Sequence, residues 1–188
     1  MARVAKVLSK SQVYGETVLI FLTVGNWPKG FDRLVEAVDE LKARGFIQDE
    51  VVAQIGSGKY RPAFLNAVEY CSPTEFIEFL DKSKIVISHA GMGTIGQAIQ
   101  RAKPVIVVPR KASLGEHNDD HQAATARQLE AERSVLVAYE VSELPKKIKE
   151  AETFRPSNEK NCGQQMIRTI DEFLREAAIQ KYRVQNDD

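Results

Sequence analysis

The chain lacks the features that would draw it to a charged partner or into a membrane. Its 26 lysines and arginines balance 26 aspartates and glutamates, so the formal net charge is zero. No global field therefore favours nucleic acid or an anionic membrane, and we expect no nucleic-acid partner. No apolar run approaches the roughly 20 residues of a spanning helix. The run 18–24, for example, has only the length of a strand.

Cysteine is also scarce. Cys71 and Cys162 show neither the spacing of a metal site nor that of a redox motif. We expect reduced thiols in a cytoplasmic protein, with a single disulfide as the alternative. The first six residues lack the apolar stretch of a secretory signal. With 188 residues, 43% of them hydrophobic, the chain has the size of one domain and can bury a core.

Short apolar runs rich in β-branched residues alternate with stretches of helical spacing. The runs predict strands at 18–24, 51–55, 67–71, 85–88, 105–108 and 134–138. Helices are predicted from Phe31 to Gly45, from Ser72 (which can share a capping box with Glu75), from Thr94, from Asp120, from Ser142 to Ile148, and from Gly163 to Tyr182. Such alternation is typical of a doubly wound parallel sheet, so we expect a single Rossmann-like α/β domain.

The most informative segment is 85–99. A buried strand ends at Ser88 and His89, the chain turns through Gly91 and Gly93, and helical spacing follows. Glycines let the backbone approach a ligand, and a new helix presents free N–H groups and the positive end of its dipole. This unit suits the diphosphate of a nucleotide, while a tight turn without a ligand is the alternative.

Two further loops follow predicted strands. The run 104–110 leads into the polar loop 115–122. The loop Gly56-Ser57-Gly58-Lys59 is too short for an ATPase phosphate loop, and Tyr60 stands where that motif needs Ser or Thr. This loop either touches a phosphate or is a plain turn.

The order of these motifs resembles the C-terminal, donor-binding half of glycosyltransferase family 28, to which MurG belongs. HAGMGT (89–94), KPVIVVPR (103–110) and EHNDDHQ (116–122) carry the likeness, together with FLTVG (21–25) and QIG (54–56). The sequence is most similar to the stand-alone small subunits of two-part transferases that make dolichol-linked chitobiose or bacterial exopolysaccharide. The resemblance implies half of a GT-B fold. We expect residues 1–16 to be an extension and 17–188 to form the domain.

The resemblance also implies a site for a UDP-sugar on the rim where the carboxyl ends of the strands meet. His89 is expected beside the diphosphate, although a strand-end histidine that only hydrogen-bonds the turn is the alternative. Gln122, with Asp120, matches family residues that contact the donor sugar. The full set of expected binding residues is Gly25, His89, Ala90, Gly91, Met92, Gly93, Thr94, Gln97, Arg110, Glu116, His117, Asp120, His121 and Gln122.

Four residues of the loop 116–122 have the character of metal ligands: His117, Asp119, Asp120 and His121. They precede a predicted helix, where acidic residues are expected as caps, and Glu116 and Asp119 could simply be solvated. Family 28 enzymes are thought to need no metal, because a helix N-terminus offsets the charge of the leaving diphosphate. We therefore expect neither a metal nor a cofactor.

One position departs from the family pattern. MurG has a glutamate in the first turns of the helix after its glycine loop, where the carboxylate grips both ribose hydroxyls. The matching residue here is Gln97, which can donate and accept hydrogen bonds but carries no charge. The resemblance thus leaves the preference for uridine open.

The resemblance implies a donor-binding subunit of an inverting transferase whose catalytic base lies on a partner. We expect that partner to be membrane-anchored, to bind a lipid-linked acceptor, and to recruit this chain to the cytoplasmic face of the membrane. An apolar stripe on the predicted last helix either packs on its own domain or reaches the partner; its residues are Met166, Ile167, Ile170, Phe173, Leu174 and Ala177. A non-catalytic, homo-oligomeric nucleotide-sugar-binding module is the alternative, and an epimerase of the same architecture is disfavoured by length.

Overall fold

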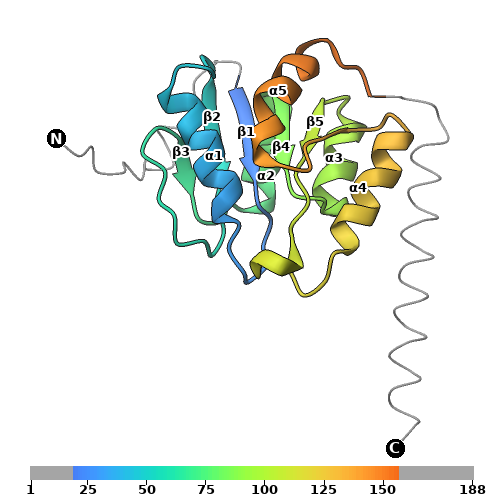
Figure 1. Cartoon of the computed structure of the whole chain (residues 1–188). Coiled ribbons are helices and arrows are strands. Elements are labelled where there is room, and N and C mark those ends of the chain that lie inside the picture. Colours follow the sequence, from blue (N-terminus) through green and yellow to red (C-terminus); the bar gives the residue numbers. More distant parts are fainter. Residues whose placement is uncertain (1–18, 157–188) are drawn as a thin grey trace, which may run out of the picture. The chain divides into compact units, whose positions relative to one another are not determined.

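The β-branched runs form the parallel sheet that the sequence predicts. In a computed structural model, which describes residues 19–156, the sheet has six strands in the order β3-β2-β1-β4-β5-β6, and every neighbouring pair is parallel (Figure 1). The strands are β1 Leu19–Thr23, β2 Glu50–Gln54, β3 Asn66–Val68, β4 Ser83–Ser88, β5 Val105–Val107 and β6 Leu136–Val137. This confirms the doubly wound Rossmann-like sheet.

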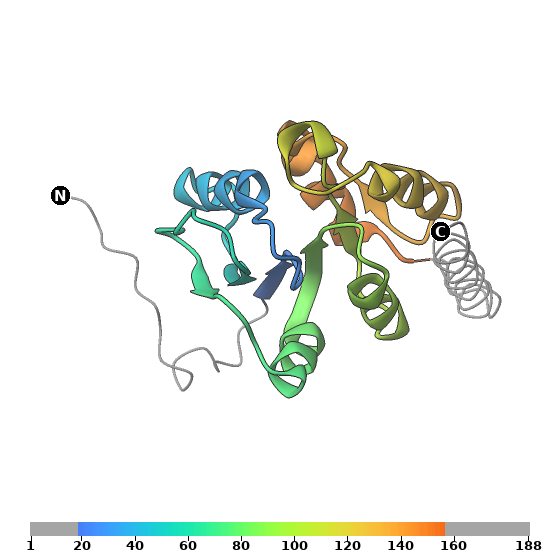
Figure 2. The ribbon, with the colours of Figure 1, turned by 90° about the horizontal axis from the view of Figure 1, so that it is seen from below.

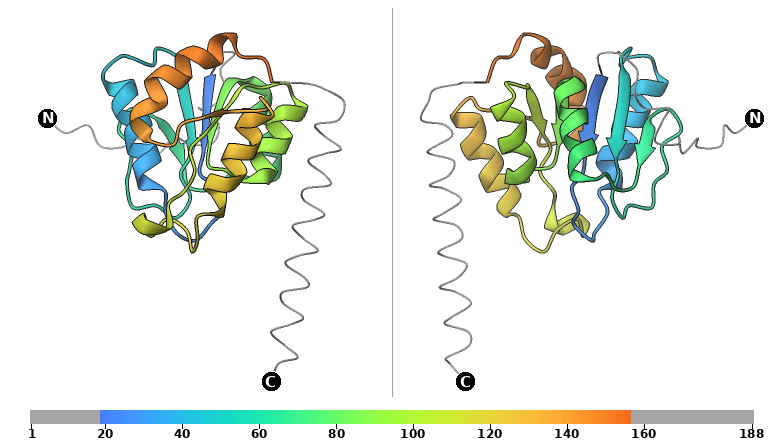
Figure 3. Two further views of the ribbon diagram at one scale, coloured as in Figure 1. Left: turned by 45° about the vertical axis from the view of Figure 1, so that its right-hand side comes forward. Right: turned by 180° about the vertical axis from the view of Figure 1, so that it is seen from behind.

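Helices cover both faces of the sheet. They are α1 Asp32–Ala43, α2 Pro73–Lys82, α3 Met92–Gln100, α4 His121–Ala131 and α5 Leu144–Thr153, with short 3-10 turns η2 Ala112–Leu114 and η3 Val141–Glu143. The views of Figures 2 and 3 place α1 and α5 on one face and α2 and α3 on the other, while α4 packs against β6 at the end of the sheet. Within residues 19–156, no helix combines the length and apolar character needed to cross a bilayer.

The ends of two helices follow directly from the sequence. Ser72 Oγ accepts a hydrogen bond from the Glu75 backbone N–H at 3.2 Å, and Glu75 Oε2 accepts from the Ser72 N–H at 2.7 Å, which is the predicted capping box. Pro73 occupies the first turn of α2, where its missing N–H costs nothing. Gly45 follows α1 with φ +72°, a conformation that favours glycine, and so ends that helix as predicted.

Other boundaries differ from the prediction. Ser142 is not a helix cap: it lies inside η3, and α5 begins only at Leu144. Glu140 and Glu143 instead cap each other around η3. The strand expected at 134–138 is shortened to β6, because the Ser134 N–H bonds to Leu129 O and closes the end of α4. Helix α3 starts two residues earlier than expected, at Met92.

The core lies between the sheet and the helices on both faces. Nearly every residue of β1, β2, β4 and β5 is buried, which explains why these strands read as continuous apolar runs. Residues 1–16, Cys162 and the predicted helix 163–182 with its apolar stripe lie outside the described residues, so those expectations stay predictions.

The strand order creates one switch point. The chain winds outward from β1 to β2 and β3, then crosses back to β4 and continues outward to β6. The loops after β1 and β4 therefore leave toward opposite faces of the sheet, at its lower edge in Figure 1, and a switch point of this kind is where such sheets bind ligands.

Candidate functional site

A cavity of about 590 Å³ opens at this switch point. It lies at the carboxyl ends of β1, β2 and β4 and is bounded by the N-terminal turns of α2 and α3. Its lining residues are Thr23, Gly25, Asn26, Gln54, Cys71, Pro73, Phe76, Ile77, His89, Gly91, Gly93, Thr94 and Gln97. The volume falls in the range of small-molecule sites, and one wall is polar while the other is apolar.

The carboxamide of Gln54 fixes the loop after β1. Its Oε1 accepts hydrogen bonds from Thr23 Oγ1 at 2.6 Å and from the Gly25 N–H at 3.1 Å, while its Nε2 donates to Gly25 O at 3.0 Å and Glu69 O at 3.2 Å. Because Gln54 and Thr23 are fully buried, this network is protected from competing water. It holds Gly25 at the floor of the cavity.

His89 lies between two glycines of the cavity wall. A Cβ added to Gly25 would come within 2.5 Å of the imidazole, and one added to Gly91 within 2.2 Å. Any side chain at either position would therefore displace the ring. Gly25 also has φ +72°, which disfavours other residues.

The imidazole of His89 is neutral at physiological pH. Burial, followed by the positive charge of Arg110, lowers the pKa of His89 to about 4. His89 therefore contributes a ring N–H or a lone pair to the cavity and no charge. The electrostatic attraction for an anion must come from elsewhere.

The N-terminus of α3 supplies that attraction. Gly91 is the N-cap, and no side chain caps the helix, so its first N–H groups point out of the first turn. A Cβ built on Gly93 meets nothing within 4 Å, so the space in front of this turn is open. Free N–H groups and the positive end of the helix dipole make this turn suitable for phosphate oxygens.

An apolar wall faces this turn across the cavity. Cys71 and Pro73 come from the connection between β3 and α2, and Phe76 and Ile77 from the first turns of α2. Phe76 is held edge-on against Phe21 of β1, with ring centroids 5.4 Å apart. A flat wall of this kind suits a planar base. These residues belong to no motif in the sequence, and the only signal for them is their position after a strand end.

Gln97 is the residue that the resemblance to family 28 matches with a ribose contact. It lines the cavity from the second turn of α3, and its backbone O accepts a hydrogen bond from Arg101 Nη1 at 3.0 Å. Its side chain is partly exposed, and it follows the turn Gly91–Thr94 along α3.

Two expected binding residues, Arg110 and Gln122, are buried and are not among the residues that line the cavity. Arg110 is 1% exposed and donates to the carbonyl oxygens of Val24, Lys29, Gly30 and Glu116. Gln122 Oε1 accepts from the Arg110 N–H at 3.1 Å. These contacts tie the loop after β1 to the loop after β5. Arg110 and Gln122 therefore hold the backbones of these loops in place, and their expected contact with the donor stays a prediction.

Glu116 is likewise buried, which excludes the solvated alternative for this residue. Its carboxylate pairs with Arg33 through two hydrogen bonds of 2.9 and 3.0 Å and also accepts the Lys111 N–H at 2.9 Å. Bidentate pairs of this kind are strong and directional. Glu116 lines a second cavity of about 700 Å³ on the α1 side.

The loop Gly56–Lys59 belongs to that second cavity and not to the first. The Lys59 N–H donates to Asp32 Oδ2 at 3.0 Å, and Ser57 Oγ donates to Pro28 O at 2.7 Å. These bonds make it a turn packed on the start of α1. The sequence left two hypotheses for this loop, a phosphate contact and a plain turn, and these bonds favour the plain turn.

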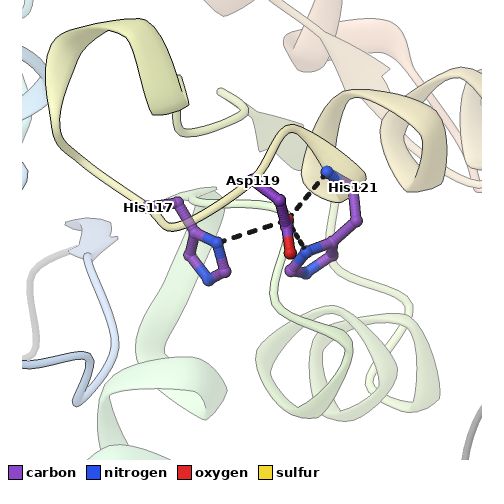
Figure 4. A group of neighbouring side chains, drawn as sticks. All are labelled: His117, Asp119 and His121. Atoms are coloured by element: carbon purple, nitrogen blue, oxygen red, sulfur yellow. Dashed lines mark hydrogen bonds and ion pairs between the residues drawn. The ribbon is translucent and has the colours of Figure 1, made fainter. Parts of the chain in front are cut away.

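The loop 117–121 brings His117, Asp119 and His121 together (Figure 4). Asp119 Oδ1 accepts hydrogen bonds from the backbone N–H and the ring of His121, so Asp119 is structured and not merely solvated. Asp120 occupies the N-cap position of α4 but makes no side-chain cap; its Oδ1 accepts from the Ala112 N–H at 2.9 Å instead. The expected acidic N-cap is therefore confirmed in position, but its side chain bonds outside the helix.

Six of the fourteen expected binding residues line the cavity: Gly25, His89, Gly91, Gly93, Thr94 and Gln97. Ala90 is buried in the turn and Met92 is the first residue of α3. The remaining six come from the loop after β5: Arg110, Glu116, His117, Asp120, His121 and Gln122. That loop contacts the loop after β1 through Trp27, whose ring stacks on His117 with centroids 4.6 Å apart.

Residues 19–178 match the glycosyltransferase family 28 C-terminal domain. The UDP-N-acetylglucosamine transferase subunit ALG13 of Cryptococcus neoformans is 36% identical over 88 residues, which cover 46% of this chain and 42% of that protein. The human protein of the same name is 27% identical over 124 residues, which cover 60% of this chain and 10% of that protein. This chain thus spans between a tenth and about two fifths of the length of these relatives.

Solved structures agree with the expected fold. An NMR solution structure of ALG13 has a TM-score of 0.55 at 18% identity, and the match covers 81% of this chain and 94% of that one. The crystal structure of the glycotransferase of kitacinnamycin has a TM-score of 0.56 at 16% identity, covering 79% of this chain and 37% of that one. The fold is thus that of the C-terminal half of a GT-B glycosyltransferase, as the sequence predicts.

Proposed function

This chain belongs to the glycosyltransferase family 28 C-terminal domain family, and we propose that it is the donor-binding subunit of an inverting, UDP-sugar-dependent glycosyltransferase. The observation that carries the proposal is the cavity at the β1–β4 switch point. It joins an uncapped helix N-terminus, a partly exposed amide and a flat apolar wall. These three surfaces match the diphosphate, the ribose and the base of a nucleotide sugar.

In this proposal the diphosphate lies against the turn Gly91–Thr94. The first N–H groups of α3 bond to its oxygens, and the open space before Gly93 admits them. The neutral ring of His89 adds a hydrogen bond without adding charge. Gln97 contacts the ribose hydroxyls, and the base lies on the wall formed by Cys71, Phe76 and Ile77.

The reaction is a direct displacement at the anomeric carbon. An acceptor hydroxyl loses its proton to a base, its oxygen bonds to the sugar, and the bond from the sugar to the diphosphate breaks. The negative charge that develops on the leaving diphosphate is stabilised by the N-terminus of α3. No metal or other cofactor takes part in this step.

The base belongs to a second subunit in this proposal. His89 is the only imidazole in the wall of the cavity, and its pKa of about 4 makes it a weak base. The relatives described above are named as subunits of a UDP-N-acetylglucosamine transferase, which supports a partner here. The partner is membrane-anchored and presents a lipid-linked acceptor, so the reaction takes place at the cytoplasmic face of the membrane.

Calorimetry and a transfer assay together test this function. The full chain is titrated with UDP-GlcNAc, UDP-glucose and a GDP-sugar, and transfer to a lipid-linked acceptor is measured with and without the candidate membrane partner. We expect the chain alone to bind a UDP-sugar without transferring it, and the partner to restore transfer in the presence of EDTA. Transfer by the isolated chain would contradict the division of the site. Binding without transfer in any complex would support the alternative of a nucleotide-sugar-binding module.

A further inference from the structure

We propose that His117, Asp119 and His121 form a binding site for one divalent transition-metal ion of the Zn²⁺ type, next to the donor cavity (Figure 4). One ligand atom from each residue lies within 4.8 Å of the other two. Atoms that bind one such ion at about 2.1 Å lie about 3–4 Å apart, so small side-chain rotations would bring the three into place. This site is independent of the proposed transfer step.

The arrangement already converges on one point. Asp119 Oδ1 accepts a hydrogen bond from His121 Nδ1 and lies 3.5 Å from His117 Nδ1. Figure 4 shows the carboxylate between the two rings. Two imidazole nitrogens and a carboxylate oxygen are a ligand set that suits Zn²⁺, Co²⁺, Ni²⁺ or Cu²⁺ better than Mg²⁺ or Ca²⁺.

His117 gives a second, independent indication of a ligand. Its side chain is only 10% exposed, yet its Nδ1 is buried without a hydrogen-bond partner and faces Asp119. A buried polar atom left unpaired costs free energy, so it needs an explanation.

The surroundings hold the His117 ring in place. Trp27 stacks on one face of the ring at an interplanar angle of 20°, and the His121 ring meets it edge-on with centroids 4.7 Å apart. Lys29 Nζ donates to Asn118 Oδ1 at 2.9 Å and to His117 O at 3.4 Å, which ties this loop to the loop after β1. The ligands are therefore positioned by packing before any ion binds.

The single tryptophan makes the site directly observable. Trp27 is the only tryptophan of the chain, so the tryptophan fluorescence comes from a ring that stacks on His117. The full chain, stripped with EDTA and dialysed, is titrated with ZnCl₂ by calorimetry and with CuCl₂ by fluorescence. We expect one ion per chain and quenching of Trp27 by Cu²⁺ with the same stoichiometry.

Matched variants assign the ligands. Asp119→Asn and His121→Gln change exposed side chains and should leave the circular dichroism spectrum unchanged, while each weakens Zn²⁺ binding at least tenfold, since loss of second-shell partners alone costs about 10–100-fold. His89→Gln, which removes the only other histidine, should retain Zn²⁺ binding. The double variant Cys71→Ser, Cys162→Ser should retain it too, and the Co²⁺ complex should show no thiolate charge-transfer band.

Two results would overturn the proposal. One is the absence of Zn²⁺ and Cu²⁺ binding to the stripped chain. The other is binding that survives Asp119→Asn and His121→Gln but disappears in His89→Gln or in the cysteine variant. Neither result bears on the donor cavity, because UDP-sugar binding is measured separately in EDTA.

Discussion

Replacing Gly93 with aspartate should weaken binding of a UDP-sugar on the order of 100-fold and leave the fold intact. The new carboxylate would stand at the first turn of α3, where the proposed diphosphate contacts the free N–H groups. Two unit charges about 4 Å apart repel by roughly 1 kcal/mol in water and by roughly 4 kcal/mol at the effective dielectric near a protein surface. Gly93 is exposed, so we expect an intermediate loss of about 3 kcal/mol, or on the order of 100-fold in affinity.

The fold should survive for two reasons. A Cβ at Gly93 meets nothing within 4 Å, and an acidic residue in the first turn of a helix is stabilising by about 0.3–1 kcal/mol. Gly93→Ala is the matched control, because it adds the same Cβ without charge and should stabilise α3 by about 0.5–1 kcal/mol. Calorimetry with UDP-GlcNAc and thermal unfolding measure both properties. A folded Gly93→Asp variant with the affinity of the original chain would refute the placement of the diphosphate.

Three further predictions follow from the same contacts. If Gln97 contacts the ribose, Gln97→Glu should increase the preference for UDP over 2′-deoxy-UDP by about 1 kcal/mol in calorimetry, and an unchanged ratio would place the ribose elsewhere. The pKa of His89 is lowered to about 4, so between about pH 6.5 and 4 the unfolded chain binds more protons than the folded one. The free energy of unfolding, measured in urea, should therefore decrease by up to about 3 kcal/mol as the pH is lowered through this window. His89→Gln should remove this part of the decrease. Arg110→Met keeps the packing on Phe31 but loses the bonds to four carbonyl oxygens, so it should lower the free energy of unfolding by at least about 3 kcal/mol; a loss below 1 kcal/mol would show that the loops are held together by other contacts.

The sequence predicts the sheet well because its signals are local. Runs such as 85–88 are apolar on both faces, and a strand of that kind can exist only inside a covered parallel sheet. The capping box at Ser72 and Glu75 needs only four neighbouring residues. The prediction that Ser142 caps a helix was wrong, although its signal is also local. Ser142 has the composition of a cap, but the reciprocal pair Glu140 and Glu143 takes that role.

The site was harder to predict because it is built from distant segments. Cys71 and Phe76 entered no motif, and they reach the cavity only because β3 lies at one end of the sheet and α2 returns to β4. Arg110 was predicted to touch the ligand, yet its partners Val24 and Lys29 lie more than 80 positions earlier in the chain. No spacing in the sequence encodes such contacts. The same limit applies to the stacking of Trp27 on His117.

The glycines of the cavity separate what the fold requires from what a bound phosphate would require. Gly25 and Gly91 were predicted to contact the ligand, but the fold alone explains both glycines, because any side chain there would collide with His89. Gly93 differs, since its Cβ would meet nothing and glycine weakens a helix. The fold therefore gives no reason for a glycine at this position, whereas a phosphate group held against the first turn of α3 does. Gly93 is thus the glycine that distinguishes a ligand site from a tight turn, and the affinity of Gly93→Ala and Gly93→Asp for UDP-GlcNAc decides between them.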